Sequence, residues 1–143
     1  MPNEEFSWTT KDQLKLFAQA WTPEGEVKAV LALVHGLGEH SGRYQDVART
    51  LNREGYALFG FDLRGHGRTE GPRGHFSYTA ALDDVDRLIN EAQKLFPGKP
   101  VFLYGHSMGG NLVLYYAMKR MPTCLFGIIS TSPALGTAKP VPG

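Results

Sequence analysis

A G-x-S-x-G pattern occurs at residues 105–109, with Ser107 at its centre. A serine hydroxyl is a poor nucleophile unless it is exposed, oriented and placed beside a base. A sharp turn between a strand and a helix provides the exposure and the orientation. Gly105 and Gly109 allow such a turn, because a Cβ atom at either position would collide with neighbouring backbone. The pattern therefore predicts Ser107 as a catalytic nucleophile.

The residues on either side of this pattern have the character that the turn requires. An apolar run at residues 101–104 predicts a strand, and the apolar-rich residues 112–118 predict a helix. The N-terminus of that helix would place a positive dipole beside an oxyanion that forms next to Ser107. A glycine-rich turn with an incidental serine is the alternative interpretation.

A second glycine-containing loop, His35-Gly36-Leu37-Gly38, directly follows the apolar run at residues 29–34. Where a G-x-S-x-G turn carries the nucleophile, the oxyanion hole takes one N–H from the residue after the nucleophile. The other N–H comes from the loop after the third strand. Met108 and Leu37 occupy these two positions, and Gly36 is the adjoining loop glycine. We therefore predict that the backbone N–H groups of Leu37 and Met108 form an oxyanion hole.

Other chemistry that the sequence suggests has poorer spacing. His35, Glu39 and His40 approximate the zinc motif H-x-x-E-H, but with one residue too many and in a loop where no helix aligns the imidazoles. The glycines of residues 36–42 resemble a dinucleotide fingerprint whose last gap is three residues instead of two. Cys124 has no histidine near it in the sequence, so we expect a small core residue and not a nucleophile. These patterns predict neither a bound metal nor an organic cofactor.

Three further side chains lie next to the predicted turns. His106 adjoins Ser107, but neighbouring side chains point apart at such a turn, so we expect it to hydrogen-bond locally. His66 lies in the turn at residues 65–67, and we expect its ring to hold that turn. Either histidine is an alternative candidate for the base. Asp62 directly follows the apolar run at residues 56–61 and is expected to accept hydrogen bonds from the amides of its own loop.

The residues that a serine triad needs after its nucleophile are absent. The chain order in this type of site is serine, then Asp or Glu, then His. All 14 acidic residues and all five histidines precede Ser107, and the segment after it holds only Lys119, Arg120 and Lys139 as charges. We therefore expect the triad Asp and His to be absent from this chain and to come from a segment outside it.

Strands and helices alternate along the chain. Ser41 and Gly55 would cap the first helix at its two ends, and the acids at residues 83–86 would lie near the start of the longest helix, where the macrodipole favours them. The expected elements are a hairpin of 6–10 and 14–21, strands at 29–34, 56–61, 101–104 and 126–130, and helices between 41 and 55, at 79–96 and at 108–121. This order predicts an α/β protein with a mostly parallel sheet, an antiparallel N-terminal hairpin and helices on both faces.

Three segments together carry a family resemblance, HGLGEHSGRY at residues 35–44, DLRGHG at 62–67 and GHSMGG at 105–110. They resemble the monoacylglycerol lipases and lysophospholipases of the α/β-hydrolase fold, and the resemblance extends over residues 6–135. Thr69 stands where that family is expected to have a serine.

The resemblance carries implications for fold and chemistry. It implies an α/β-hydrolase fold, Ser107 as the nucleophile, and an oxyanion hole made by the amides of Leu37 and Met108. It implies hydrolysis of single-chain glycerolipid esters without a metal or an organic cofactor. It also implies that residues 1–143 are the N-terminal part of one core domain, with residues 136–143 near the start of a lipid-binding cap.

The composition excludes several classes of protein. The chain has 143 residues, 42% of them apolar, and its 15 Lys and Arg against 14 Asp and Glu leave no basic excess for binding nucleic acid. Its apolar runs fall short of the roughly 20 residues that span a bilayer. Acids stand where an export signal would carry Lys or Arg. We expect a cytoplasmic protein that contacts a membrane surface only transiently, to reach a lipid substrate.

The sequence thus favours a serine ester hydrolase acting on single-chain glycerolipids through an acyl-enzyme on Ser107. A C-terminal segment or a second chain would complement it, because an α/β-hydrolase core with its cap needs about 250 residues or more. The isolated chain is expected to be inactive or nearly so. Two alternatives stay open. One is a catalytically silent fragment or interaction module, and the other is a related peptidase or non-haem peroxidase on the same fold.

Overall fold

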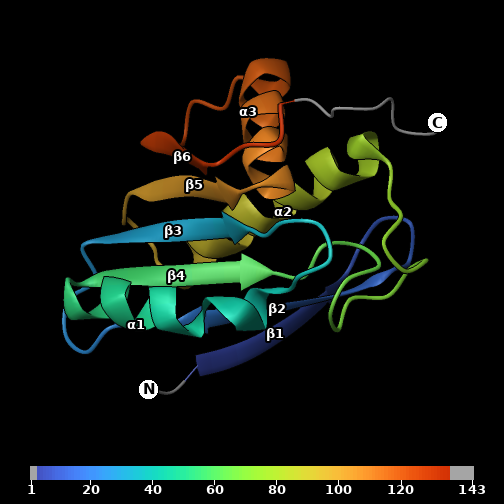
Figure 1. The fold of residues 1–143 in the computed structure, drawn as a ribbon. Coiled ribbons are helices and arrows are strands. Elements are labelled where there is room, and N and C mark those ends of the chain that lie inside the picture. The colour runs from blue at the N-terminus through green and yellow to red at the C-terminus, as the bar shows by residue number, and fades with distance from the viewer. Residues whose placement is uncertain (1–2, 136–143) are drawn as a thin grey trace.

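The computed structural model describes residues 3–135, which form a six-stranded sheet with helices on both faces (Figure 1). The strands are β1 (Asn3–Thr9), β2 (Lys15–Trp21), β3 (Ala29–Val34), β4 (Tyr56–Phe61), β5 (Val101–His106) and β6 (Gly127–Thr131). The helices are the short 3₁₀-helix η1 (Ser41–Tyr44), α1 (Gln45–Arg53), α2 (Tyr78–Leu95) and α3 (Met108–Arg120). The predicted α/β class is confirmed, and the predicted elements are all present with bounds shifted by a few residues.

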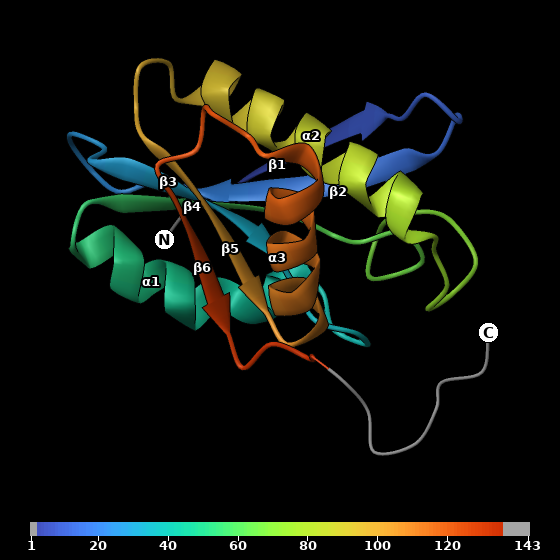
Figure 2. The same ribbon diagram turned by 90° about the horizontal axis from the view of Figure 1, so that it is seen from above.

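The strand order across the sheet is β1-β2-β4-β3-β5-β6. The four strands from β3 to β6 run parallel to one another, and the hairpin adds β2 antiparallel to β4. Helix α1 covers one face of the sheet, and α2 and α3 cover the other (Figure 2). Strand β3 is buried along its whole length because helices lie over both of its faces.

The register of the central strands brings three chain segments to one edge of the sheet. Val34 at the end of β3 lies opposite Phe61 of β4 on one side and Gly105 of β5 on the other. The loops that follow these strands therefore leave the sheet at the same level. In open α/β sheets this carboxyl edge is where ligands bind.

Two expectations about helix ends are wrong. Ser41 does not cap a helix with its side chain, because its hydroxyl donates instead to the buried carboxylate of Asp62 at 2.6 Å. A hydrogen bond to a carboxylate is about twice as strong as a neutral capping bond. The first turn of α2 contains no acid, and its cap is Ser77, whose side chain accepts from the Ala80 N–H. The acids at residues 83–86 lie one and two turns further on, where they form ion pairs and hydrogen bonds.

Cys124 is exposed and not a core residue, which is a third correction. It lies in the connection between α3 and β6, beyond the left-handed residue Met121 that ends α3. Residues 121–126 of this connection are exposed or half-buried, so the rest of the fold covers little of their side chains. The expectation that residues 136–143 begin a cap lies outside the described residues.

Across residues 3–135, no helix combines the length and the apolar character needed to cross a bilayer.

Candidate active site

Ser107 lies in a strained turn between β5 and α3. Its backbone has φ 58° and ψ −118°, a conformation that residues other than glycine rarely adopt and that costs about 1–3 kcal/mol. The surrounding chain holds it there. The Ser107 N–H donates to the Thr131 carbonyl of β6 at 3.0 Å, and the Ser107 carbonyl accepts from the N–H of Asn111 at 3.1 Å. The turn leaves the Ser107 side chain only partly buried, at the carboxyl edge of the sheet.

Both glycines of the turn are required by close backbone approaches. A Cβ at Gly105 would lie 2.2 Å from the Gly109 carbonyl oxygen, and a Cβ at Gly109 would lie 2.1 Å from the Val34 carbonyl oxygen. Neither oxygen can move without disturbing α3 or β3, since both belong to the backbone. The predicted reason for these glycines is confirmed.

The loop after β3 packs directly against this turn. A Cβ at Gly36 would come within 3.2 Å of the Ser107 Cβ, so the chain at Gly36 lies against the serine. The Leu37 side chain next to it is 64% exposed. Within residues 3–135, the N–H groups of Leu37 and Met108 have no hydrogen-bond acceptor. Two unengaged donors therefore lie on segments that adjoin Ser107, on the residues that the sequence singled out.

Asp62 connects this loop to the one after β4. One carboxylate oxygen accepts from the N–H and the hydroxyl of Ser41 at 2.7 and 2.6 Å, and the other accepts from the Arg68 N–H at 2.9 Å. The expected bond to its own loop is confirmed, but the bonds to Ser41 have no signal in the sequence. Thr69, where a serine was expected, donates through its hydroxyl to the Asp62 carbonyl and accepts from the Phe17 N–H. Asp62 is therefore a fully engaged structural carboxylate.

No described histidine or carboxylate hydrogen-bonds the Ser107 hydroxyl. His106 forms a hydrogen bond with the Thr131 hydroxyl at 2.8 Å, as expected of a local role. His66 has Nδ1 at 2.9 Å from the Arg64 carbonyl, which holds the turn as predicted. Its Nε2 is buried and has no partner within residues 3–135. Neither ring is placed as a base for Ser107.

Arg64 is the buried charge that sequence reasoning missed. Its guanidinium donates to both oxygens of Asp84 on α2, at 2.6 and 3.0 Å, and to both oxygens of Asp12 in the β1–β2 turn, at 2.5 and 2.9 Å. Burial raises the pKa of Asp84, whereas the hydrogen bonds from Arg64 hold the pKa of Asp12 well below its usual range. The partners are 20 and 52 residues from Arg64, so no local pattern marks them.

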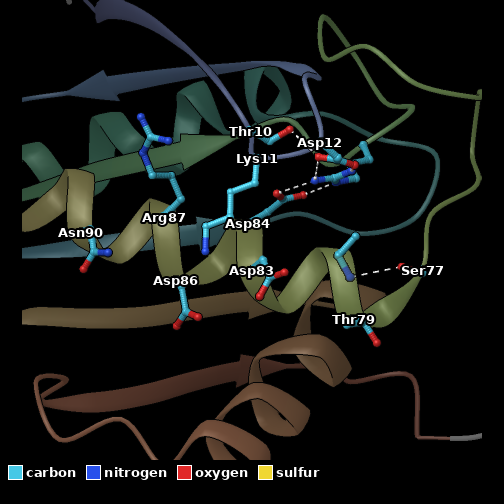
Figure 3. A pocket seen from close by; sticks show the side chains of 12 residues that line it. Thr10, Lys11, Asp12, Ser77, Thr79, Asp83, Asp84, Asp86, Arg87 and Asn90 are labelled. Atoms are coloured by element: carbon cyan, nitrogen blue, oxygen red, sulfur yellow. Dashed lines mark hydrogen bonds and ion pairs between the residues drawn. The ribbon is translucent and has the colours of Figure 1, made fainter.

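A polar pocket lies between the β1–β2 turn and α2 (Figure 3). Two of its carboxylates pair with Arg64 as described, and two others, Asp83 and Asp86, pair with Arg120. Ser107 is not among the residues that line it. Its charges hold the hairpin and α3 to α2, and the pocket is distinct from the serine turn.

The fold and the serine turn define a class of protein. A serine in a strained strand–helix turn, facing a glycine loop from the third strand of a largely parallel sheet, is the arrangement of the α/β-hydrolases. Residues 25–143 match the family described as serine aminopeptidase, S33. The chain belongs to this family of α/β-hydrolases, and the resemblance to its monoacylglycerol lipases is confirmed.

Three relatives illustrate the similarity. Human monoglyceride lipase is 42% identical over 119 residues, which are 82% of this chain and 39% of that protein. The structure of monoacylglycerol lipase from Paleococcus ferrophilus is 37% identical with a TM-score of 0.71, covering 99% of this chain and 47% of that one. A soluble variant of monoglyceride lipase from Saccharomyces cerevisiae, bound to a substrate analogue, is 27% identical with a TM-score of 0.81, covering 90% and 44%. This chain therefore spans less than half the length of each.

Proposed function

We propose that this chain is the nucleophile-bearing part of a serine hydrolase that cleaves esters of single-chain glycerolipids. The observation that carries the proposal is the strained Ser107, set between β5 and α3 and adjoined by the unengaged N–H groups of Leu37 and Met108. The stored strain is typical of functional turns. Each oxyanion-hole donor of this kind is worth about 2.7–4 kcal/mol of transition-state stabilisation.

The proposed reaction proceeds through an acyl-enzyme. A histidine base outside the chain takes the hydroxyl proton of Ser107, while the Ser107 oxygen forms a bond to the ester carbonyl carbon. The carbonyl electron pair moves onto the carbonyl oxygen, which the N–H groups of Leu37 and Met108 hold. Collapse of this intermediate breaks the bond to the alcohol oxygen, which takes the proton from the base. Water then attacks the acyl-enzyme carbonyl in the same way, with the histidine again as the base. This step releases the fatty acid and restores the Ser107 hydroxyl.

The lipid substrate class is supported by the relatives named monoglyceride and monoacylglycerol lipases. The description of the matching family supports a second candidate, hydrolysis of an N-terminal peptide bond. The two substrates differ in the leaving group and in what recognises it, and not in the nucleophile. Transient contact with a membrane surface and a cytoplasmic location remain predictions that go with a lipid substrate.

We further propose that residues 1–143 are the N-terminal part of one core domain, with the complementary segment lying against β6. Strand β6 has no neighbour on its outer side within residues 3–135. Large apolar side chains on β6, on the C-terminal end of α3 and on the segments next to β6 are exposed; these side chains, together called the apolar edge, are Met118, Met121, Phe126, Ile129 and Leu135. Exposed apolar surface of this kind marks a site of association. The segment that covers it would also supply the triad Asp and His.

A fluorophosphonate probe read by intact mass tests the proposal. The full-length polypeptide that carries this chain is expected to gain one adduct, mapped to Ser107 by peptide mass spectrometry. Ser107→Ala should abolish the adduct, and Ser7→Ala, on the exposed face of β1, should leave it unchanged. Residues 1–143 alone should label at a small fraction of that rate. Absence of the adduct from the full-length protein would indicate a silent module.

Turnover of the same protein separates the two substrate candidates. A monoacylglycerol and an aminoacyl-p-nitroanilide are each presented to wild type and to Ser107→Ala. We expect hydrolysis of the glycerolipid, dependent on Ser107, and little cleavage of the anilide. The opposite preference would assign the peptidase function to the same nucleophile.

A further inference from the structure

His35 is a fully buried polar side chain that the proposed chemistry does not use. It follows the last residue of β3, and both of its ring nitrogens are engaged. Nδ1 lies 2.7 Å from the Gly36 carbonyl oxygen, and Nε2 accepts from the Leu63 N–H at 2.9 Å. The ring therefore joins the loop after β3 to the loop after β4.

These contacts determine where the ring carries its proton. The Leu63 N–H can only donate, so Nε2 presents a lone pair and Nδ1 carries the hydrogen. Nδ1–H then donates to the Gly36 carbonyl. Burial lowers the pKa of His35 to about 4, which keeps the ring neutral near pH 7. A charged ring would place two N–H groups face to face at Nε2.

The bond to the Gly36 carbonyl sets the orientation of the next N–H. The peptide bond between Gly36 and Leu37 is trans, since residues 3–135 contain no cis peptide. In a trans peptide the C=O and the N–H point in opposite directions. Because the Gly36 carbonyl points at the buried ring, the Leu37 N–H points away from it. Within residues 3–135 that N–H has no hydrogen-bond acceptor.

The loop would have freedom to rotate this peptide without the ring. This peptide turns about ψ of Gly36 and φ of Leu37, and glycine places few limits on the first of these torsions. The Gly36 carbonyl has one other contact, from the Glu39 N–H, but at 3.4 Å it is much longer than the 2.7 Å contact with His35. The imidazole is therefore the main restraint on the carbonyl of this peptide.

We propose that His35 is a positioning residue for the oxyanion hole, whose Nδ1–H holds the Gly36 carbonyl and so aims the Leu37 N–H at the oxygen of the reacting carbonyl. The inference rests on the proposed function, because it assigns the Leu37 N–H its catalytic use. His35 itself touches neither the substrate nor Ser107.

Two substitutions separate the two hydrogen bonds of the ring. His35→Asn places an amide N–H near the position of Nδ1 and retains the bond to Gly36, whereas His35→Gln places an amide oxygen near the position of Nε2 and retains the bond to Leu63. Each variant keeps one hydrogen bond of the ring and loses the other, so we expect the two variants to lose similar amounts of stability. The full-length protein is assayed on p-nitrophenyl butyrate, with affinity for a trifluoromethyl ketone measured in parallel.

We expect His35→Gln to lower kcat about 100-fold, with KM changed less than about threefold, because one oxyanion donor is lost. Affinity for the trifluoromethyl ketone, whose adduct carries an oxyanion, should fall by a similar factor. His35→Asn should retain kcat within about tenfold of wild type. Equal losses in the two variants, or a greater loss in His35→Asn, would overturn the positioning role while the proposed function stands.

A second measurement needs no variant. Nitrogen-15 NMR of the histidine rings at pH 7 should show His35 protonated at Nδ1 and unprotonated at Nε2. The opposite tautomer would overturn the inference, whatever the variants do. A wild-type protein that neither hydrolyses the ester nor labels at Ser107 would overturn the proposed function and this inference with it.

Discussion

Two regions of the molecule differ in what they bury and what they expose to solvent. The loops after β3 and β4 bury polar groups and pair most of them within the chain; the Asp62 carboxylate, for example, accepts from Ser41 and Arg68, whereas the buried Nε2 of His66 has no partner within residues 3–135. The apolar edge around β6 exposes large side chains, with Phe126 71% exposed. The first region is held mainly by hydrogen bonds between its own residues. The second presents apolar side chains to solvent, and nothing in residues 3–135 covers them.

The opposite edge of the sheet shows that the difference is not a general property of edges. Strand β1 is also an outer strand, but its exposed positions include Glu4, Glu5 and Ser7. Charges on an outer strand discourage pairing with another chain. Strand β6 has the sequence Gly-Ile-Ile-Ser-Thr, without a charge. The contrast indicates that β1 is adapted to water and β6 to contact with another segment.

The largest loss of stability is expected from Gly109→Ala, at the start of α3, where the chain packs against the end of β3. The new Cβ would lie 2.1 Å from the Val34 carbonyl oxygen, so β3 and α3 would have to separate. We expect the free energy of unfolding to fall by about 4 kcal/mol, measured by urea denaturation. Gly25→Ala is the control, because nothing lies within 4 Å of its Cβ and only its φ of +78° opposes the change. A similar small loss in both variants would show that the turn is loosely packed.

Asp62→Ala is expected to lower the free energy of unfolding by about 3 kcal/mol, because it leaves the buried N–H and hydroxyl of Ser41 and the half-buried N–H of Arg68 without their acceptor. The same denaturation measures it. Asp46→Ala, which removes a carboxylate that is 92% exposed, should change stability by less than about 0.5 kcal/mol. Equal effects at the two positions would contradict the view that the loops are held by buried polar bonds.

The buried ring of His35 predicts a pH dependence of stability. The unfolded chain binds a proton there near the ordinary pKa of 6.5, whereas burial lowers the pKa in the folded chain to about 4. Between these values the unfolded state holds more protons, so the free energy of unfolding falls as the pH falls, by about 1 kcal/mol per pH unit. The full stability is present above pH 6.5. Denaturation from pH 7 to pH 4.5 should show this slope, and His35→Asn should reduce it. An unchanged slope in the variant would place the titration on another group.

The smallest change in stability is expected at the apolar edge. Phe126→Ser removes an exposed side chain, so the free energy of unfolding should change by less than about 0.5 kcal/mol. Self-association of residues 1–143, followed by sedimentation velocity, should nevertheless decrease. Ser7→Ala on β1 should alter neither quantity. A monomeric wild-type fragment at high concentration would indicate that the apolar edge does not drive association.

Local features of the molecule could be predicted from the sequence. The strand before Ser107, the helix after it and the glycines of the turn follow from apolar runs and from residue types that act over a few positions. The position of Gly36 just after a predicted strand marks it as a glycine of the loop that adjoins the serine turn. Contacts between distant segments could not be predicted in this way. Arg64 meets Asp12 and Asp84 only because the fold brings the β1–β2 turn and α2 to the loop after β4.

The sequence by itself determined the alternation of strands and helices, the serine turn and the absence of an acid or a histidine after Ser107, because each is a matter of residue type and short spacing. The tertiary structure alone decided that Ser41 binds Asp62 and does not cap a helix, that Cys124 is exposed, and that the ring of His35 holds the Gly36 carbonyl. The strength of a hydrogen bond and the burial of a side chain depend on which distant segments pack together, and the register of β3 against β4 and β5 sets that packing here.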